Sequence, residues 1–248
     1  LIVFLLGAAG VLKWQLDETR KTSERTTQTI SLAQGSPLLV LADGRTMLLN
    51  DSVGWGREAD LQQVRLDEQG ITYQQSDSLE KEEVFNTLII PKGGEFQIQL
   101  ADGSRVWLNS ETELRYPVNF TGKKREVILA GEAYFDVVGD PEHPFVVKVN
   151  DLDIRVLGTQ FNVNAYTAGI VKTVLVEGRV NLRGRMGEID LHPRQMGEYR
   201  ETDGNLHMME VDVLPHVAWK DGNFIFRSES LENIMDKLSI WYNLDVFY

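Results

Sequence analysis

The sequence of 248 residues contains no cysteine. Disulfide bonds, cysteine metal sites and thiol catalysis are therefore excluded, and a chain without thiols suits an oxidising compartment. Basic residues are also scarce, because 25 Lys and Arg stand against 37 Asp and Glu, for a formal net charge of −12. Such a charge repels nucleic acid unless a local basic patch overcomes it. The nearest candidate is Lys123-Lys124-Arg125, which is followed by Glu126 and is predicted to be a solvated turn.

Long apolar runs are missing except at the start, where "LIVFLLGAAGVL" contains 12 uncharged residues. A membrane-spanning helix needs roughly 20 such residues. Three interpretations fit the run: the second half of a transmembrane helix, the core of a signal peptide with "GAAG" as its cleavage site, or a buried helix. Lys13 and Trp14 favour a membrane anchor, and the chain begins with Leu rather than Met. We predict a partial transmembrane helix over residues 1–16, with the remaining chain beyond the membrane.

Helical periodicity is also absent from most of the chain after the polar stretch Asp17–Thr29. In its place are short runs rich in Val, Ile, Leu, Phe and Tyr, such as "EVILA", "PFVVKV" and "VKTVLV", separated by Asp-Gly, Gly-Gly and Pro. Closely spaced short strands with turn signals indicate an all-β body. We predict stacked antiparallel strands, arranged either as a β-sandwich or as a twisted solenoid-like roll.

The sequence "LADG" occurs twice, beginning at Leu41 and again 59 residues later at Leu100. Around the second copy the apolar residues all have even numbers: Phe96, Ile98, Leu100, Val106 and Leu108. Side chains alternate between the faces of a strand, so a loop of odd length is needed to keep them on one face. The pattern predicts a three-residue loop over 101–103 with Gly103 in the left-handed conformation. Gly44 is predicted to have the same role in the first copy.

A helical pattern appears only near the end, in "RSESLENIMDKLSIWYN". Six apolar residues share one face there: Leu231, Ile234, Met235, Leu238, Trp241 and Tyr242. Ser228 or Ser230 can cap the start of this helix, and Asn243 is suited to its end. The flanking runs "GNFIF" (222–226) and "LDVFY" (244–248) are predicted to be strands. The terminal domain is therefore predicted to be a truncated β-α-β unit.

Residues that could perform chemistry are few and scattered. His143, His192, His207 and His216 form no metal-binding spacing. No G-x-S-x-G elbow is present, and "TGKK" departs from a phosphate loop at Pro117 and Lys124.

The carboxylates Glu126, Glu132 and Asp136 alternate with apolar strand residues. They are therefore predicted to face solvent rather than to act as an acid/base pair. We predict no enzyme activity, no metal and no cofactor.

Four tryptophans, Trp55, Trp107, Trp219 and Trp241, have two interpretations. They are core or interface anchors, or they are sugar-stacking platforms of a membrane-anchored periplasmic carbohydrate-binding β module. Trp107 is the first candidate for stacking, since the hairpin parity places it on the face opposite Ile98. An exposed platform of two or more rings would favour the carbohydrate module.

Four blocks of sequence occur in a familiar order: "NTLIIPKGGEFQIQLADGSRVWLNSETELRYPVNF", "REVILAGEAYFDVVGDPEHPFVVKV", "IRVLGTQFNVNAY" and "VLVEGRVNL". Together they resemble the periplasmic part of FecR-type anti-sigma factors, in the branch common among Bacteroidetes. The tail "WKDGNFIFRSESLENIMDKLSIWYNLDV" resembles the start of the STN-like domain (DUF4974) that follows in that branch. We therefore predict a juxtamembrane linker and first hairpin region over 17–85, a FecR-like β domain over 86–210, and a truncated STN-like domain over 211–248.

The resemblance implies a single-pass inner-membrane regulator with residues from about 17 onward in the periplasm. Such a protein receives a signal from the signalling domain of a TonB-dependent outer-membrane receptor. It relays that signal to an extracytoplasmic-function sigma factor, which binds a cytoplasmic domain with no counterpart in this chain. One departure from the family pattern is "LHPRQM", where Arg194 replaces the Gly of a Pro-Gly turn.

Two sets of residues follow for the predicted adaptor. Partner binding by addition to a strand edge is predicted at Phe224, Phe226, Val246 and Phe247. Structural turn or bulge positions are predicted at Gly44, Gly103, Gly131, Gly158 and Gly178. Tyr134, Phe135, Trp107 and Phe161 are predicted to be core or sheet-face residues.

Overall fold

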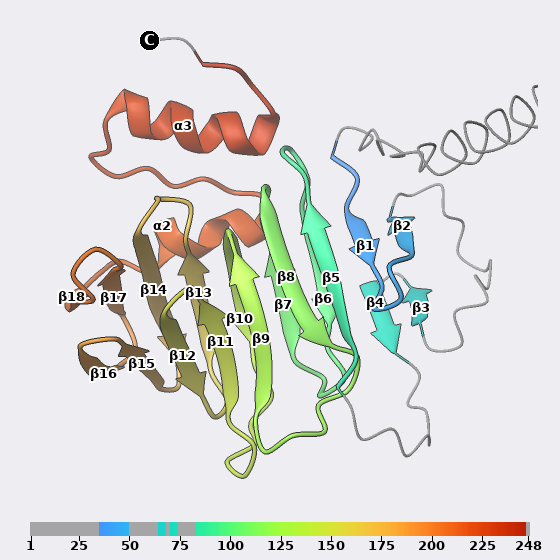
Figure 1. The fold of residues 1–248 in the computed structure, drawn as a ribbon. Coiled ribbons are helices and arrows are strands. Elements are labelled where there is room, and N and C mark those ends of the chain that lie inside the picture. Colours follow the sequence, from blue (N-terminus) through green and yellow to red (C-terminus); the bar gives the residue numbers. More distant parts are fainter. Residues whose placement is uncertain (1–34, 50–63, 68–69, 74–82, 247–248) are drawn as a thin grey trace, which may run out of the picture. The chain divides into compact units, whose positions relative to one another are not determined.

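The computed structural model describes residues 35–49, 64–67, 70–73 and 83–246, all of which belong to one compact unit. They form two β-sheets that face each other, with helices only near the C-terminal end of the described chain (Figure 1). The predicted mainly β fold is confirmed. Within these residues no helix is long and apolar enough to cross a membrane. The predicted transmembrane helix of residues 1–16, with Trp14, and the polar stretch after it lie outside the described residues.

The order of the strands across each sheet differs from their order along the chain. The nine-stranded sheet consists, from one edge to the other, of β16 (Gly187–Leu191), β15 (Val180–Gly184), β12 (Leu152–Val156), β11 (Phe145–Val149), β9 (Arg125–Ala130), β8 (Thr112–Pro117), β5 (Phe85–Ile90), β1 (Leu38–Val40) and β2 (Thr46–Leu48). The seven-stranded sheet consists of β18 (Leu206–Glu210), β17 (Gln195–Arg200), β14 (Ile170–Glu177), β13 (Gln160–Asn164), β10 (Glu132–Asp136), β7 (Arg105–Leu108) and β6 (Phe96–Gln99). A separate pair, β3 (Val64–Asp67) and β4 (Gly70–Tyr73), lies beside β6.

From β5 onward the chain passes back and forth between the two sheets, usually after one hairpin. The sequence left open a β-sandwich and a solenoid-like roll. The structure combines the two, because the chain winds like a solenoid and its strands form a two-sheet sandwich. One pairing departs from the antiparallel expectation: β9 and β11 are parallel, with Val127 opposite Val147. Between them the chain crosses to the other sheet as β10 and returns, so it enters β11 in the direction it had in β9.

The space between the sheets is filled by the alternate apolar residues of both. Phe135 and Phe161, cross-strand partners on β10 and β13, stack with centroids 5.0 Å apart, and Phe145 from the opposite sheet lies 6.2 Å from Phe135. All three rings are fully buried. Burial of such aromatic and aliphatic surface is the main stabilising term for a sandwich of this size.

Both "LADG" hairpins have the predicted three-residue loop. Leu100 N–H donates to the Ser104 carbonyl at 2.8 Å, and Gly103 has φ 85°. The first copy repeats this arrangement with Leu41 and Gly44, which has φ 84°. The hairpins lie in different sheets, however, since β1 and β2 belong to the nine-stranded sheet and β6 and β7 to the other. All five predicted turn glycines have positive φ, and at Gly131 a Cβ would stand only 2.5 Å from Thr112 Oγ1.

Arg194 adopts the conformation expected of the glycine that it replaces. Its φ is 71°, and the turn is closed by the Gln195 N–H, which donates to the His192 carbonyl at 3.0 Å. The turn geometry is therefore kept at the cost of placing a side chain in the left-handed region.

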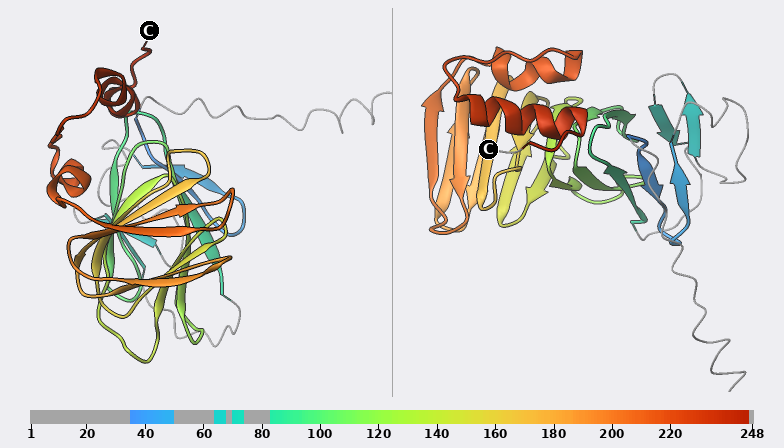
Figure 2. Two further views of the ribbon diagram at one scale, coloured as in Figure 1. Left: turned by 90° about the vertical axis from the view of Figure 1, so that its left-hand side faces the viewer. Right: turned by 90° about the horizontal axis from the view of Figure 1, so that it is seen from above.

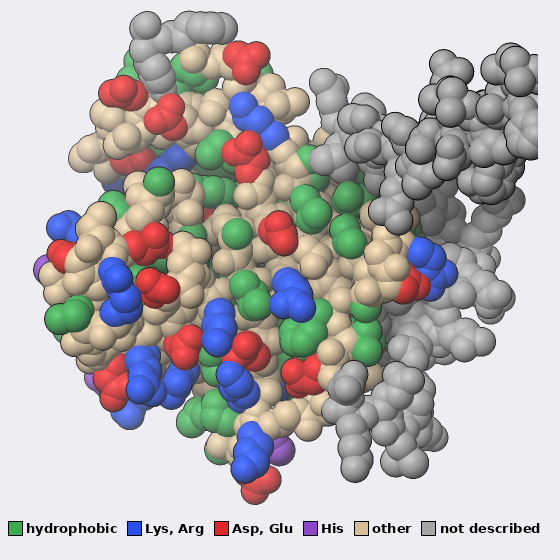
Figure 3. Space-filling view, viewed as in Figure 1, with side chains coloured by type: hydrophobic (Ala, Val, Ile, Leu, Met, Phe, Trp, Pro, Cys, Tyr) green, Lys and Arg blue, Asp and Glu red, His purple; other side chains and the backbone are tan. Residues whose placement is uncertain are grey.

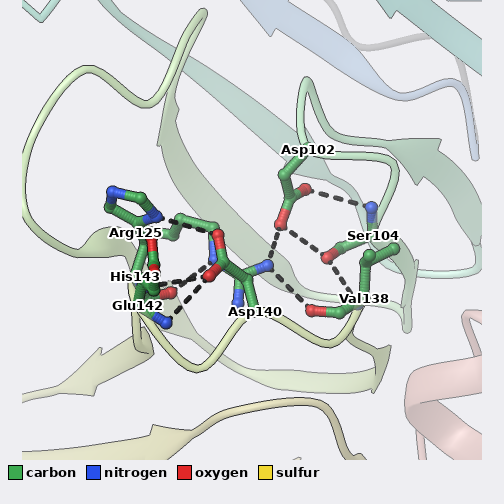
Figure 4. A network of polar contacts seen from close by, with 7 residues as sticks. All are labelled: Asp102, Ser104, Arg125, Val138, Asp140, Glu142 and His143. Carbon is green, nitrogen blue, oxygen red and sulfur yellow. Dashed lines mark hydrogen bonds and ion pairs between the residues drawn. The ribbon is translucent and has the colours of Figure 1, made fainter.

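A buried ion pair at one end of the sandwich corrects the prediction for Arg125 (Figure 4). Its side chain is 4% exposed, and Nη1 donates to Asp102 Oδ2 at 2.6 Å and to the Val138 carbonyl at 2.9 Å. Asp102 also accepts from Ser104 N–H and Oγ, so the hairpin loop, the start of β9 and the loop at Val138 are joined. Arg125 is not part of a solvated turn, because it shares the inward face of β9 with Val127 and Leu129.

The outer face of the nine-stranded sheet carries charges of both signs, as the space-filling view shows (Figure 3). Glu126 lies near Lys124 and Lys148, and Arg155 lies 3.4 Å from Asp153. Exposed pairs of this kind contribute little to stability and mainly keep this face soluble. The predicted outward position of Glu126 is correct.

Candidate functional site

The C-terminal segment, residues 211–246, covers part of the sandwich (Figure 2). α2 (Leu214–Val217) and the 3-10 helix η1 (Ala218–Asp221) lie against the outer face of the seven-stranded sheet. α3 (Leu231–Tyr242) lies across one end of the sheets, where the Gly93 N–H donates to the Ile240 carbonyl at 3.0 Å. Gly222 ends η1 with φ 71°, a conformation that glycine adopts without strain.

Five aromatic residues, called the aromatic cluster below, join this segment to the sheet: Trp107, Tyr134, Trp219, Phe224 and Trp241. The rings of Trp107 and Tyr134 meet edge to face at 5.6 Å, those of Trp219 and Trp241 at 6.4 Å, and those of Phe224 and Trp241 at 4.9 Å. Edge-to-face contacts of this kind add to the energy of apolar burial. Trp219 is 5% exposed and lies at the centre of the contact.

A row of polar residues runs beside the cluster on the same face of the sheet. Asn109, Glu132 and Asn164 lie opposite one another on three segments that are neighbours across the sheet. Glu132, on β10, lies in the middle. The buried Glu132 carboxylate accepts from Asn109 Nδ2 at 2.8 Å and from Asn162 Nδ2 at 2.9 Å. We call Glu132, Asn109 and Asn162 the Glu132 cluster.

Each asparagine of the Glu132 cluster is held in one orientation by a donor to its oxygen. The Ser110 N–H donates to Asn109 Oδ1 at 2.8 Å, and Trp219 Nε1 donates to Asn162 Oδ1 at 3.2 Å. Because both amide oxygens are occupied, both NH₂ groups face the carboxylate. The indole of Trp219 therefore completes a polar network whose other members all precede the C-terminal segment.

Burial raises the pKa of Glu132, although the hydrogen bonds from Asn162, Asn164 and Asn109 act in the opposite direction. The prediction that Glu132 faces solvent is therefore wrong in its outcome. Strand alternation does place Glu132 on the outer face, yet its side chain is buried there and hydrogen-bonded to Asn109 and Asn162. Asp136 keeps a partly exposed position, where Arg105 Nη2 lies 2.5 Å from its Oδ2.

A Glu132→Gln variant tests this burial through the pH dependence of stability. A carboxyl whose folded pKa is raised stabilises the fold below its ordinary pKa of 4.5, and this contribution is lost as the pH rises further. The free energy of unfolding of the wild-type protein, measured by urea titration, is therefore expected to fall relative to that of Glu132→Gln as the pH rises. Parallel pH profiles of the two proteins would contradict this. Glu126→Gln, on the outer face of the other sheet, is the control.

Two of the four predicted partner residues, Phe224 and Phe226, lie in or beside the aromatic cluster. Phe224 is part of the cluster, and Phe226 stacks on Phe224 with centroids 6.1 Å apart. Val246 is partly buried, and Phe247 lies outside the described residues. Phe224 therefore packs on the C-terminal segment itself.

Of the expected β-α-β unit, the described residues contain the helix and no strand. Ser230 caps α3 by accepting from the Asn233 N–H at 3.2 Å, and Asn243 ends it with φ 52°, as predicted. Residues 222–226 and 244–246 form no strand, because neither run has a strand beside it with which to pair. On α3 the predicted apolar face is only half-buried, and Leu231 and Tyr242 at its two ends are exposed.

The histidines lie on separate elements, and no group of three or more metal-ligating side chains occurs in the described part of the chain. His143 Nδ1 lies 2.9 Å from Asp140 Oδ2, and His192 and His207 are exposed. Partial burial lowers the pKa of His216. The four histidines therefore lie apart from one another, and His216 is the most buried of them.

Trp107 provides no flat platform for a sugar. It is half-buried within the aromatic cluster, with the Lys220 ammonium of η1 6.0 Å from its ring centroid. Trp219 and Trp241 face each other inside the same cluster, and Trp55 lies outside the described residues. These positions count against the carbohydrate-binding module.

One feature of the sequence, outside the motifs considered above, indicates the Glu132 cluster. Asn162 and Asn164 occupy alternate positions in the strand "QFNVN", and asparagine is depleted in strands. Two asparagines on one strand face indicate a polar surface with a specific partner, in this case the Glu132 carboxylate.

The chain is similar to a known protein family and to solved structures, among them two crystal structures. The family described as "FecR protein" matches residues 86–181. Two crystal structures, each described as a "putative anti-sigma factor" from Parabacteroides distasonis ATCC 8503, are similar to the chain at 30% sequence identity. The structure at 2.50 Å has a TM-score of 0.60 and covers 64% of this chain and 75% of its own. The structure at 1.65 Å has a TM-score of 0.59, with coverages of 63% and 74%. No curated protein matches the chain.

Proposed function

The chain belongs to the FecR family of regulatory proteins, and from this premise we propose that it relays a signal to an extracytoplasmic-function sigma factor. The signal comes from the signalling domain of a TonB-dependent outer-membrane receptor, and the relay uses protein–protein contacts rather than catalysis or a cofactor. The protein is anchored in the inner membrane through residues 1–16, with residues from about 17 onward in the periplasm. The observation that carries the proposal is the 30% identity to an anti-sigma factor candidate over 75% of that protein's chain.

We place the receptor contact on the exposed side of α3. No residue of α3 is fully buried, and Leu231 at its start is 73% exposed. Tyr242 and Leu244 at the other end are also exposed. An amphipathic helix held this loosely can rearrange when a partner domain binds, since little packing has to be broken.

The aromatic cluster gives such a rearrangement a route to the β domain. Trp241 of α3 contacts Trp219, and Trp219 donates to Asn162 of the Glu132 cluster. Movement of α3 therefore disturbs Trp219 and the bond that orients Asn162 toward Glu132. On this proposal, receptor binding at α3 alters the outer face of the seven-stranded sheet.

Co-purification of the complete protein from its native host, across both membranes, tests the proposal. Recovery of a sigma factor together with a TonB-dependent receptor is the expected result. A Leu231→Asp variant should reduce receptor recovery about tenfold, because it places a charge in the proposed contact. Leu157→Asp, a change of equal chemistry at a β-domain loop that is 49% exposed, should leave recovery unchanged. Recovery of neither partner, with retention on a glycan resin, would overturn the proposal.

A further inference from the structure

At one end of the sandwich, the last strand of each sheet has an edge that pairs with no described strand (Figure 2, left view). β16 is the last strand of the nine-stranded sheet, β18 is the last strand of the seven-stranded sheet, and the two lie next to each other. Within the described residues no strand pairs with the outer edge of β18. At the other end of the same sheet, by contrast, β6 has β4 beside it.

The hydrogen bonds of β18 show which residues face the free edge. The Arg200 N–H donates to the Asn205 carbonyl at 3.0 Å, and the Val211 N–H donates to the Arg194 carbonyl at 2.9 Å. In an antiparallel ladder, alternate residues bond to the same neighbour, so the odd-numbered residues of β18 bond to β17. The N–H and C=O groups of Leu206, Met208 and Glu210 therefore point away from the sheet, toward the free edge.

Exposed methionines gather at this end of the molecule. Met186 is 72% exposed, Met208 is 52% exposed and Met209 is exposed as well, although the whole sequence has only 6 methionines. A Cβ on Gly204, in the turn before β18, would lie 2.9 Å from Met186 Cγ, so the β15–β16 turn reaches the β17–β18 turn. Methionine side chains are flexible and polarisable, and they adapt to the side chains of a bound peptide.

The edge also lacks the features that normally protect a strand from pairing. Neither β16 nor β18 contains lysine, arginine or proline, and their register with β15 and β17 shows no bulge. The charges they carry are acidic and exposed: Glu188, Asp190 and Glu210. Arg185, in the neighbouring turn, is paired with Asp151 at 3.5 Å.

We propose that the free edge of β18 is a docking site for an extended segment of a partner protein in which apolar and basic residues alternate. The segment adds to the seven-stranded sheet as an antiparallel or parallel strand through the backbone of Leu206, Met208 and Glu210. The side chains of Met208 and Glu210 share one face of the sheet, and the side chain of Met209 lies on the other. The basic side chains of the segment therefore lie beside Glu210, and its apolar side chains lie beside Met209. A second copy of this chain is a poorer occupant, because the net charge of −12 disfavours self-association.

The proposed docking site goes beyond the regulatory proposal. The experiments below probe β18 alone, and their outcome does not depend on what binds α3. The probe is a short peptide of alternating Val and Lys, compared with a peptide of alternating Val and Glu, added to the whole chain. Affinity is measured by fluorescence anisotropy, and amide hydrogen exchange is followed by NMR. The Val/Lys peptide is expected to bind and to slow exchange at Leu206, Met208 and Glu210, since their N–H groups gain acceptors.

A proline at Met208 removes one of these N–H groups without breaking a bond to β17, and should weaken peptide binding about tenfold. If Met208→Pro does not fold, Met208→Lys keeps the backbone and repels the basic peptide, with the same expected loss. Leu157→Lys, at a site of similar exposure in another loop, is the matched control. Equal binding of both peptides, or unchanged affinity in the Met208 variants, would overturn the proposal. So would concentration-dependent protection of these amides without peptide, because it would identify a second copy as the occupant.

Discussion

Replacing Asp102 with alanine is expected to destabilise the protein by about 3–5 kcal/mol, because it leaves the Arg125 guanidinium buried without its counter-ion. Arg125 Nη1 lies 2.6 Å from Asp102 Oδ2, and Nη2 has no partner of its own within hydrogen-bonding distance. The remaining bonds, to the carbonyls of Val138 and His143, do not neutralise the charge. Urea unfolding followed by circular dichroism measures the loss.

The repeated hairpin supplies a matched control for this prediction. Asp43 makes the same turn as Asp102, accepting from the Arg45 N–H at 3.0 Å as Asp102 accepts from the Ser104 N–H. Its other partner, Arg45, is exposed, so Asp43→Ala removes the turn bond without exposing a buried charge. A much smaller loss is expected for Asp43→Ala. Equal losses in the two variants would show that the turn, and not the ion pair with Arg125, decides the effect.

Replacing Trp219 with alanine is expected to weaken the packing of the C-terminal segment on the sheet by about 3–5 kcal/mol, the usual range for deleting a buried large aromatic side chain. The segment is then expected to detach from the sheet. The variant loses the ring contact with Trp241 and the hydrogen bond to Asn162. Limited trypsin digestion measures the release, since Lys220 and Arg227 lie in the segment and should be cut faster. The β-sandwich itself should unfold at a nearly unchanged urea concentration, because its core between the sheets is untouched.

Trp219→Phe separates the two contributions of this side chain. Phenylalanine keeps most of the apolar contact but cannot donate to Asn162, so a loss of about 1 kcal/mol is expected. Asn162 then becomes free to turn its oxygen toward Glu132, and the pH dependence assigned to Glu132 should change in the same variant. Unaltered trypsin sensitivity in Trp219→Ala would mean that other residues hold the segment.

Local patterns in the sequence predicted those parts of the fold whose geometry is set within a few residues. The three-residue loops of both hairpins followed from side-chain parity. The limits of α3 followed from a serine cap at Ser228 or Ser230, of which Ser230 is the cap, and from Asn243. The strands flanking α3 could not be predicted in the same way, because a strand exists only where another strand pairs with it. Residues 222–226 are rich enough in apolar residues for a strand, yet they pack through Phe224 on Trp241 instead.

The sequence by itself determined the β class, the turn positions and the face on which each strand residue lies, since these depend on the two-residue period and on local backbone preference. Tertiary structure alone decided which of those faces are covered. Glu132 lies on the outer face, as its parity requires, yet it is buried in a network that Trp219, 87 residues later in the chain, joins through Asn162. Arg125 is tolerated inside only because the Asp102 loop reaches it from the other sheet. Contacts between residues this far apart depend on how the sheets and the C-terminal segment pack, which no local pattern contains.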